Sequence, residues 1–167
     1  EWDGGNIRAS WHHHDFKAGV FYGLNHNTPD EFIAQFYADR PVTADVWELS
    51  YEIDRPYQDV THDVGVLSTD LDGDWGSIDL TYAFQINLRN EYEHVRGDNP
   101  LPQYDFTLRT HSLDTSYQHR TANHAIGELN GGLGIQGGFQ ENVYQGFSLI
   151  PNFRSFSAGL FAYERLS

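Results

Sequence analysis

The run from Ser77 to Glu93 constrains the fold of this chain more than any other stretch, because every second residue from Ile78 to Leu88 is apolar and nearly all of those between them are polar. Successive side chains of a β-strand point to opposite faces, so a period of two predicts a strand. Most strands in soluble proteins have about five or six residues, whereas a strand that crosses a bilayer needs about nine to eleven. The run is therefore long enough to cross a membrane with one apolar and one polar face. Six apolar side chains share one parity: Ile78, Leu80, Tyr82, Phe84, Ile86 and Leu88.

Composition excludes several other classes of protein. Hydrophobic residues make up 39% of the chain, and no stretch approaches the roughly 18 consecutive apolar residues of a transmembrane helix. The formal net charge is -14 and Lys17 is the only lysine, so a nucleic-acid partner is not expected. The absence of cysteine excludes disulfides and thiolate metal sites.

The length of 167 residues fits one domain over residues 1–167, or a piece of a larger domain. The first residues, Glu1, Trp2 and Asp3, do not resemble a signal peptide. We therefore expect the chain to be processed, trimmed or cut from a longer protein.

Seven strands are predicted from the alternation of side chains. A parity change within the fifth strand suggests a β-bulge near Thr110 to Ser112. The predicted class is all-β, an antiparallel meander of long strands. The predicted strands cover residues 6–12, 15–25, 58–71, 77–93, 104–118, 127–140 and 153–166.

The predicted connections alternate in length. His13, His14 and Asp15 suggest a short turn, and Asp72 to Gly76 a tight one. The long loop 26–57 contains a candidate helical turn from Asp30 to Tyr37. The remaining connections are a loop from Arg96 to Gln103, a polar turn at 119–126 and a loop at 141–152.

Short turns at one end and long loops at the other are typical of an outer-membrane β-barrel. A soluble β-sandwich or a lipocalin-like barrel also has alternating strands, but the length of these strands favours the membrane protein. An open arc of seven strands would leave unpaired edges in lipid, so we expect a segment of a larger barrel. A complete eight-stranded barrel remains an alternative. Aromatic residues near the predicted strand ends agree with interfacial girdles: Trp11, Tyr22, Trp75, Tyr92, Tyr104, Tyr117 and Tyr163.

Four stretches together carry a resemblance to a known family. They are YEIDRPYQDVTHDV (51–64), LTYAFQINLRNEYEHVR (80–96), YDFTLRTHSLDTSYQH (104–119) and LIPNFRSFSAGLFAYERL (149–166). In this order they resemble the middle of the β-barrel of a TonB-dependent outer-membrane receptor, of the group that imports metals or metal complexes. The resemblance covers residues 45–167 and, more loosely, those before them.

The resemblance implies a barrel of about 22 strands around a plug domain, located in the bacterial outer membrane. It implies outer-membrane lipid, the remaining barrel, the plug and the periplasmic TonB protein as partners, and uptake of a metal ion or siderophore-like complex. The chain contains neither a plug nor a TonB box. Matching residues have structural roles: Arg55 and Pro56 before the third strand, and Ile150 to Ser155 before the seventh. Such receptors perform no covalent chemistry, so no catalytic residue is carried over.

Histidines and carboxylates in the predicted loops are candidate cargo ligands. If the loops share one rim, His26 and His94 converge with neighbouring carboxylates to capture a divalent cation such as zinc, for which imidazole and carboxylate are suitable ligands. The alternative is a hydrated acidic loop, and no HExxH motif is present. The candidate substrate-binding residues are His26, Asp30, Glu31, Asp39, His94 and Asp98.

Other histidines suggest weaker sites. On a strand, His12 and His14 would share a face and present two imidazoles to a metal; in a turn they would be solvated. His62, His111 and His119 are expected to face the polar lumen of the barrel.

An enzyme is not expected. Asp70, Asp72 and Asp74 resemble part of a calcium loop, but the required acid at its twelfth position is replaced by Thr81. Nucleophile-elbow and P-loop motifs are absent. The alternative function is a soluble all-β binding module, for example one whose aromatic side chains stack on carbohydrate.

Overall fold

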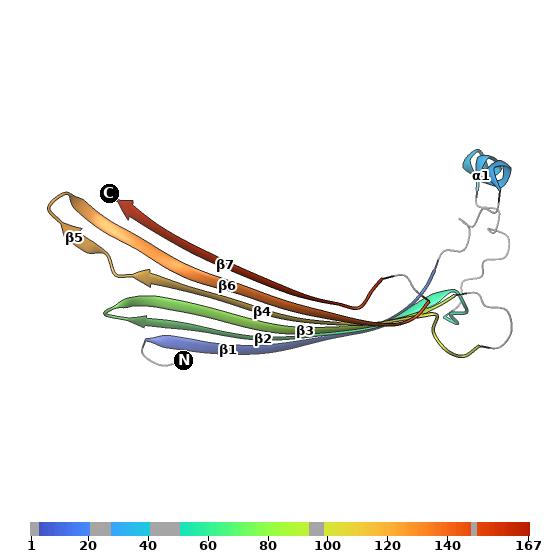
Figure 1. Ribbon diagram of the computed structural model, residues 1–167, viewed down its shortest axis with the longest axis horizontal. Coiled ribbons are helices and arrows are strands. Elements are labelled where there is room, and N and C mark those ends of the chain that lie inside the picture. Colours follow the sequence, from blue (N-terminus) through green and yellow to red (C-terminus); the bar gives the residue numbers. More distant parts are fainter. Residues whose placement is uncertain (1–3, 21–27, 41–50, 94–98, 148–149) are drawn as a thin grey trace.

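The computed structural model describes residues 4–20, 28–40, 51–93, 99–147 and 150–167, and these form one antiparallel sheet with one short helix (Figure 1). The all-β, antiparallel prediction is confirmed. Neighbouring strands in the sheet follow the chain order, with β4 and β5 on the same side of β6. The strands are β1 (Gly5–Gly19), β2 (Tyr57–Gly73), β3 (Gly76–Tyr92), β4 (Tyr104–His119), β5 (Ala122–His124), β6 (Gly127–Gly146) and β7 (Phe153–Leu166).

The long strands lie side by side over nearly their whole length. Gly5 is opposite Leu71, and Gly19 is opposite Tyr57 at the other end of the same strand pair. Short turns therefore collect at one end of the sheet, which we call the turn rim. The strand ends that the longer connections join lie at the other end, the loop rim, where Figure 1 also shows α1. From the second predicted connection onward, this alternation agrees with the sequence-based expectation.

Two glycines make the tight turns possible. Gly76 follows the turn at Asp74 and Trp75, and its φ of +131° lies in a region that side chains with a Cβ rarely adopt. A Cβ on Gly76 would also lie 2.1 Å from the carbonyl oxygen of Gln118. Gly127 begins β6 with a φ of +140°. The turn predicted at Asp72 to Gly76 is thus confirmed.

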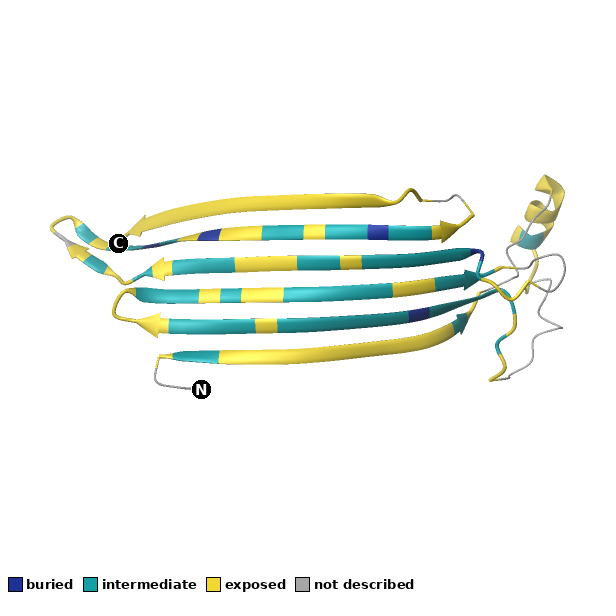
Figure 2. Ribbon diagram, turned by 60° about the horizontal axis from the view of Figure 1, so that its bottom comes forward, coloured by how far each residue is buried: buried dark blue, intermediate teal, exposed yellow. Residues whose placement is uncertain are grey.

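The sheet is a single layer without a packed core. Val60, with 7% of its surface exposed, is the only buried hydrophobic residue in the described ranges. Figure 2 shows that buried positions are few and scattered along the strands. The described strands do not close into a barrel, because β1 pairs only with β2 and β7 only with β6.

Two strand boundaries predicted from the sequence are wrong at the N-terminal end. The predicted strands 6–12 and 15–25 are not separate, because β1 runs without interruption through His13, His14 and Asp15 and ends at Gly19. Positions 21–25 of the second prediction, with Tyr22, lie outside the described residues. The polar side chains of His13, His14 and Asp15 are accommodated on the faces of the sheet, where His13 lies opposite Asp63. Trp11, expected near a strand end, lies inside β1 for the same reason.

The predicted bulge near Thr110 to Ser112 is also wrong, since β4 keeps one register with β3 and β6 there. A bulge lies further along the chain. Gln118 pairs with Gly132 and Ala122 with Leu129, so three residues of one strand face two of the other. This bulge and β5 occupy the predicted polar turn at 119–126.

The helical turn predicted near Asp30 is confirmed as α1 (Pro29–Phe36). Thr28 caps it: its hydroxyl accepts from the Glu31 amide, while the Glu31 carboxylate accepts from the Thr28 amide. In the described ranges, no helix is both long and apolar enough to cross a membrane. The predicted loop at 141–152 is shorter than expected, because β6 continues to Gly146.

Candidate functional site

One face of the sheet, the apolar face, carries a band of mostly hydrophobic side chains, with Thr69, Thr115 and His111 among them. The alternating residues of β3 define it, and the strand register places apolar side chains of the other strands beside them. No described element covers the band: Leu160 is 81% exposed and Phe156 is 77% exposed. We define this apolar band by its members: Ile7, Ala9, Trp11, Leu67, Leu71, Ile78, Leu80, Tyr82, Phe84, Leu113, Tyr117, Leu133, Ile135, Phe139, Phe156, Ala158, Leu160 and Ala162.

A row of ionisable residues ends the band on its loop-rim side. The register aligns five such residues across the sheet, in two groups that Ile86 of β3 separates: one on β1 and β2, the other on β4, β6 and β7. In the first group, the His13 ring pairs with the Asp63 carboxylate at 2.7 Å. In the second, Glu141 accepts from two arginines. We call this set the charged row: His13, Asp63, Arg109, Glu141 and Arg154.

The opposite, polar face holds most of the hydroxyl and amide side chains. His14 lies directly opposite His62, and His62 lies opposite Asn87, whose amide donates to the His62 ring at 3.2 Å. His12 and His14 share this face, as expected for a strand. Within the described ranges, however, no group of three or more His, Asp or Glu side chains is placed to hold a metal ion.

His111 and His119 depart from the expected pattern, because the register places both on the apolar face and not with the polar side chains. His111 lies between aromatic neighbours, with its ring centroid 4.9 Å from Phe84 and 6.2 Å from Phe139. The Tyr82 hydroxyl hydrogen-bonds the His111 ring at 2.7 Å. Because Nδ1 of His111 has the Tyr82 hydroxyl as its hydrogen-bond partner, the imidazole ring is tolerated within the apolar band.

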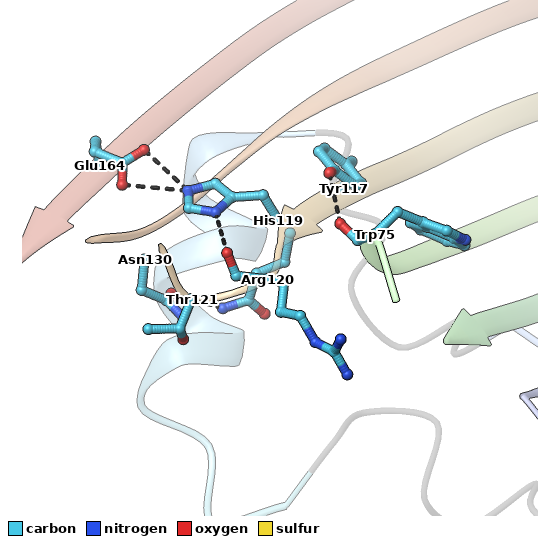
Figure 3. A network of polar contacts seen from close by, with 8 residues as sticks. Trp75, Tyr117, His119, Arg120, Thr121, Asn130 and Glu164 are labelled. Carbon is cyan, nitrogen blue, oxygen red and sulfur yellow. Dashed lines mark hydrogen bonds and ion pairs between the residues drawn. The ribbon is translucent and has the colours of Figure 1, made fainter. Parts of the chain in front are cut away.

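A second cluster lies at the turn rim, around a shallow hollow of about 420 Å³ (Figure 3). His119 of β4 and Glu164 of β7 meet there, although β6 separates their strands. Gly131 of β6 lies opposite Glu164 and follows the last β4–β6 pair, Gln118 and Gly132, at the bulge that includes His119. Its missing side chain leaves the space in which His119 and Glu164 meet. A Cβ on Gly131 would lie 2.4 Å from a carboxylate oxygen of Glu164.

Both ring nitrogens of His119 face acceptors. Nδ1 lies 2.7 Å from the carbonyl oxygen of Arg120, and Nε2 lies 3.1 and 3.2 Å from the Glu164 oxygens. Both contacts favour the protonated ring and raise the pKa of His119, with the backbone contact contributing most. His119 is the last residue of β4 and lies beyond the apolar band, so this pair is exposed to ionic screening.

Aromatic and ionic contacts hold the turns around this cluster. The Tyr117 hydroxyl donates to the carbonyl oxygen of Trp75 at 2.9 Å, and the two rings stack at 6.0 Å (Figure 3). Arg120 pairs with Asp74 at 3.0 Å. The turn before β3 is thus tied to the bulge after β4.

A third cluster closes part of the loop rim. Arg55 donates to the carbonyl oxygen of Glu93 and to the side-chain oxygen of Gln103, each at 3.0 Å. Gln103 is only 3% exposed, and the same oxygen accepts the Glu93 amide at 2.8 Å. Arg55 also donates to the carbonyl oxygens of Asn99 and Leu101. The segment before β2 is therefore fastened to the connection between β3 and β4.

The proposed cargo ligands are only partly within the described residues. His26, His94 and Asp98 lie outside them, so convergence of the two loops stays a prediction. Asp30 and Glu31 lie in the first turn of α1, where negative charge favours the helix N-terminus and Glu31 completes the cap. Asp39 follows the helix and is exposed.

Sequence reasoning did not find the charged row or the His119–Glu164 pair. Each joins residues of different strands, and only the register shows that they lie in one row. An ionisable residue at the end of an apolar alternating run was the available signal for the charged row: His13 follows such a run, and Arg154 precedes one.

No protein-family model, curated protein or solved structure matches this chain.

Proposed function

We propose that this chain forms part of the wall of an outer-membrane β-barrel, with the apolar face toward lipid and the polar face toward the lumen. The observation that supports this most strongly is the apolar band, which the described part of the chain leaves uncovered, while the other face carries most of the hydroxyl and amide side chains together with some apolar ones. A transmembrane barrel has this arrangement, because lipid replaces the protein core on its outer face.

On β3 the band extends from Ile78 to Phe84, about 20 Å along the strand at about 3.4 Å per residue. Because barrel strands are tilted by about 40°, this length spans about 15 Å of the membrane normal, less than the apolar height of about 25 Å of outer-membrane barrels. The same parity of β3 stays apolar through Ile86 to Leu88, and this longer stretch of about 34 Å spans about 26 Å at the same tilt. Trp75 and Tyr117 lie at its turn-rim end, and Trp11 and Phe84 at its loop-rim end, where aromatic girdles are expected.

The open edges of β1 and β7 also need partners under this proposal. Unpaired backbone groups in hydrocarbon cost several kcal/mol each, so a barrel wall requires further strands beside both edges. We therefore propose that the rest of a larger barrel supplies them. A soluble sandwich would instead require a second layer over the apolar face, and the described residues provide none.

The narrower part of the proposal is a TonB-dependent receptor that takes up a metal ion or a metal complex. It is supported by the resemblance of the four sequence stretches, and by long connections collected at one rim, where cargo would be captured. In that setting His26 and His94, with neighbouring carboxylates, are the proposed ligands of a divalent cation such as zinc.

Fractionation of source cells tests the membrane location. An antibody against residues 77–118 should detect a band in the outer-membrane fraction that migrates faster before boiling than after it. A band several times heavier than 19.1 kDa would support a segment of a large receptor. A band confined to the soluble fraction would overturn the proposed function.

A further inference from the structure

Two arginines of the charged row converge on a single carboxylate of the apolar face. Arg154 Nε donates to one oxygen of Glu141 at 2.7 Å, and Arg109 Nη1 donates to the other at 3.5 Å. The three residues lie on the adjacent strands β7, β6 and β4, opposite one another in the register. The group therefore carries two positive charges and one negative charge.

This group keeps donors available for another anion. A guanidinium has five N–H donors, and Glu141 engages only Nε of Arg154 and Nη1 of Arg109. In the described part of the chain, no other acceptor bonds these two side chains. Their side chains are 76% and 44% exposed, so a ligand can approach both. A phosphate oxygen pair suits such planar donors.

The surface beside Arg109, Glu141 and Arg154 indicates which class of phosphate-containing molecule fits. Phe139 and Phe156 occupy the next row toward the turn rim, immediately beside Glu141 and Arg154. Phe156 is 77% exposed and begins the uncovered apolar column of β7. A cationic group thus adjoins an apolar surface, which matches a molecule with a phosphate at one end and a hydrocarbon chain at the other.

We propose that Arg109 and Arg154 bind the phosphate of an anionic lipid headgroup, while the acyl chain of that lipid lies along Phe139 and Phe156. This inference rests on the proposed function, because it places the charged row at the boundary between hydrocarbon and headgroups. Arginine side chains at such a boundary extend their charge toward the headgroups and leave their methylene groups in the apolar layer. Glu141 keeps the two guanidiniums side by side.

The test compares two double variants of the protein purified from its membranes in a neutral detergent. R109Q/R154Q removes both charges from the charged row. R8Q/R165Q removes the same charge from the polar face, where Arg8 is opposite Ser68 and Arg165 is opposite Asn130. Native mass spectrometry measures bound phosphatidic acid and phosphatidylcholine with identical acyl chains. Inorganic phosphate is the competitor that separates a lipid site from a site for free phosphate.

We expect unchanged protein and R8Q/R165Q to bind phosphatidic acid about tenfold more tightly than phosphatidylcholine, which corresponds to one strong charge-assisted contact. R109Q/R154Q should lose this preference, and millimolar inorganic phosphate should not displace the lipid. Equal binding of the two lipids by unchanged protein would overturn the inference, as would an equal loss in both double variants. Displacement by inorganic phosphate would identify a site for the free anion instead.

Three outcomes distinguish a wrong lipid site from a wrong proposed function and from an unfolded variant. If the chain fractionates with the outer membrane but shows no preference for phosphatidic acid, the lipid site is wrong and the proposed function stands. If the chain is soluble, both are wrong. If R109Q/R154Q does not fold, as judged by its circular dichroism, the lipid preference and phosphate competition of unchanged protein still decide the question.

Discussion

His119 and Glu164 form an ion pair across a strand that belongs to neither of them, because Gly131 of the intervening strand β6 has no side chain to separate them. Residues of next-nearest strands are normally kept apart by the side chain between them. The missing side chain of Gly131 therefore leaves room for the ion pair, and the ion pair links β4 to β7 at the turn rim.

Filling this gap should destabilise the sheet. In Gly131→Ala the new Cβ would lie 2.4 Å from both Glu164 Oε2 and the Tyr163 carbonyl oxygen, so the chain must shift. We expect a loss of about 1–3 kcal/mol in the free energy of unfolding, the usual cost of overpacking. Gly137→Ala is the matched control on the same strand, because no atom lies within 4 Å of its Cβ position. Urea unfolding measures both, and equal midpoints would contradict this role of Gly131.

The pKa of His119 should depend on Glu164. Its protonated form is favoured by the hydrogen bond to the Arg120 carbonyl, and also by the hydrogen bond to Glu164 and the charge of that carboxylate. Glu164→Gln removes the carboxylate's charge, so the pKa of His119 should fall, while the contact with the Arg120 carbonyl still raises it. Ring-proton NMR titration measures the change, with His119→Asn identifying the signal. An unchanged pKa in Glu164→Gln would show that the two groups do not interact in solution.

The sign of the pH dependence follows from the raised pKa. The stabilisation that the protonated ring provides is fully present below the pKa of His119 in the unfolded chain. It is lost as the pH rises through the higher pKa of the folded protein. Unfolding midpoints of unchanged protein and His119→Asn should therefore converge as the pH is raised through that interval.

Gln103 should be more important for stability than its position in a connection suggests. Gln103→Leu leaves the Glu93 amide and one Arg55 donor without their acceptor, at a cost of about 1–3 kcal/mol for a buried group. Gln136→Leu is the control, since Gln136 is exposed on β6. Limited proteolysis should reveal faster cleavage near residues 99–103 in Gln103→Leu alone. Equal cleavage of both variants would argue against the Arg55 cluster as a fastening of the loop rim.

A charge on the apolar face distinguishes lipid from water. Leu160 is 81% exposed, so in water Leu160→Arg should change stability little. If this face contacts lipid, an arginine there should cost about 2–4 kcal/mol near the bilayer midplane. Ser157→Arg places the same charge on the polar face of β7 and should be tolerated in both settings. The amount of folded protein recovered from membranes, read from its shift on boiling, compares the two variants.

Much of the fold follows from local sequence pattern. Alternation identified β2, β3 and β7 closely, and the Asp72 to Gly76 turn followed from its composition. The failures have a common physical cause. His13 and Asp15 are polar, but a single-layer sheet accepts polar side chains on either face, so β1 continues through them. The parity change in β4 reflects apolar residues changing face, with Phe106 beside Tyr144 and Leu113 in the apolar band.

The sites were less accessible to sequence reasoning than the strands. The charged row and the His119–Glu164 pair depend on the registers of several strand pairs, and one residue of slip would place either set on opposite faces. The pairing of His12 and His14 on one face needed only the period of a strand, and it is confirmed. The proposed convergence of His26 and His94 depends on the course of long connections, which no periodic pattern specifies.

The most direct test of the central claim is a nitroxide scan of β3, made possible because the chain contains no cysteine. Single cysteines from position 78 to position 85 are labelled in the membrane-embedded protein, and collision rates with oxygen and with a water-soluble nickel complex are measured. We predict a period of two, with Ile78, Leu80, Tyr82 and Phe84 accessible to oxygen and the intervening positions accessible to nickel. Equal access of nickel to both faces would contradict the proposal that the apolar band contacts lipid.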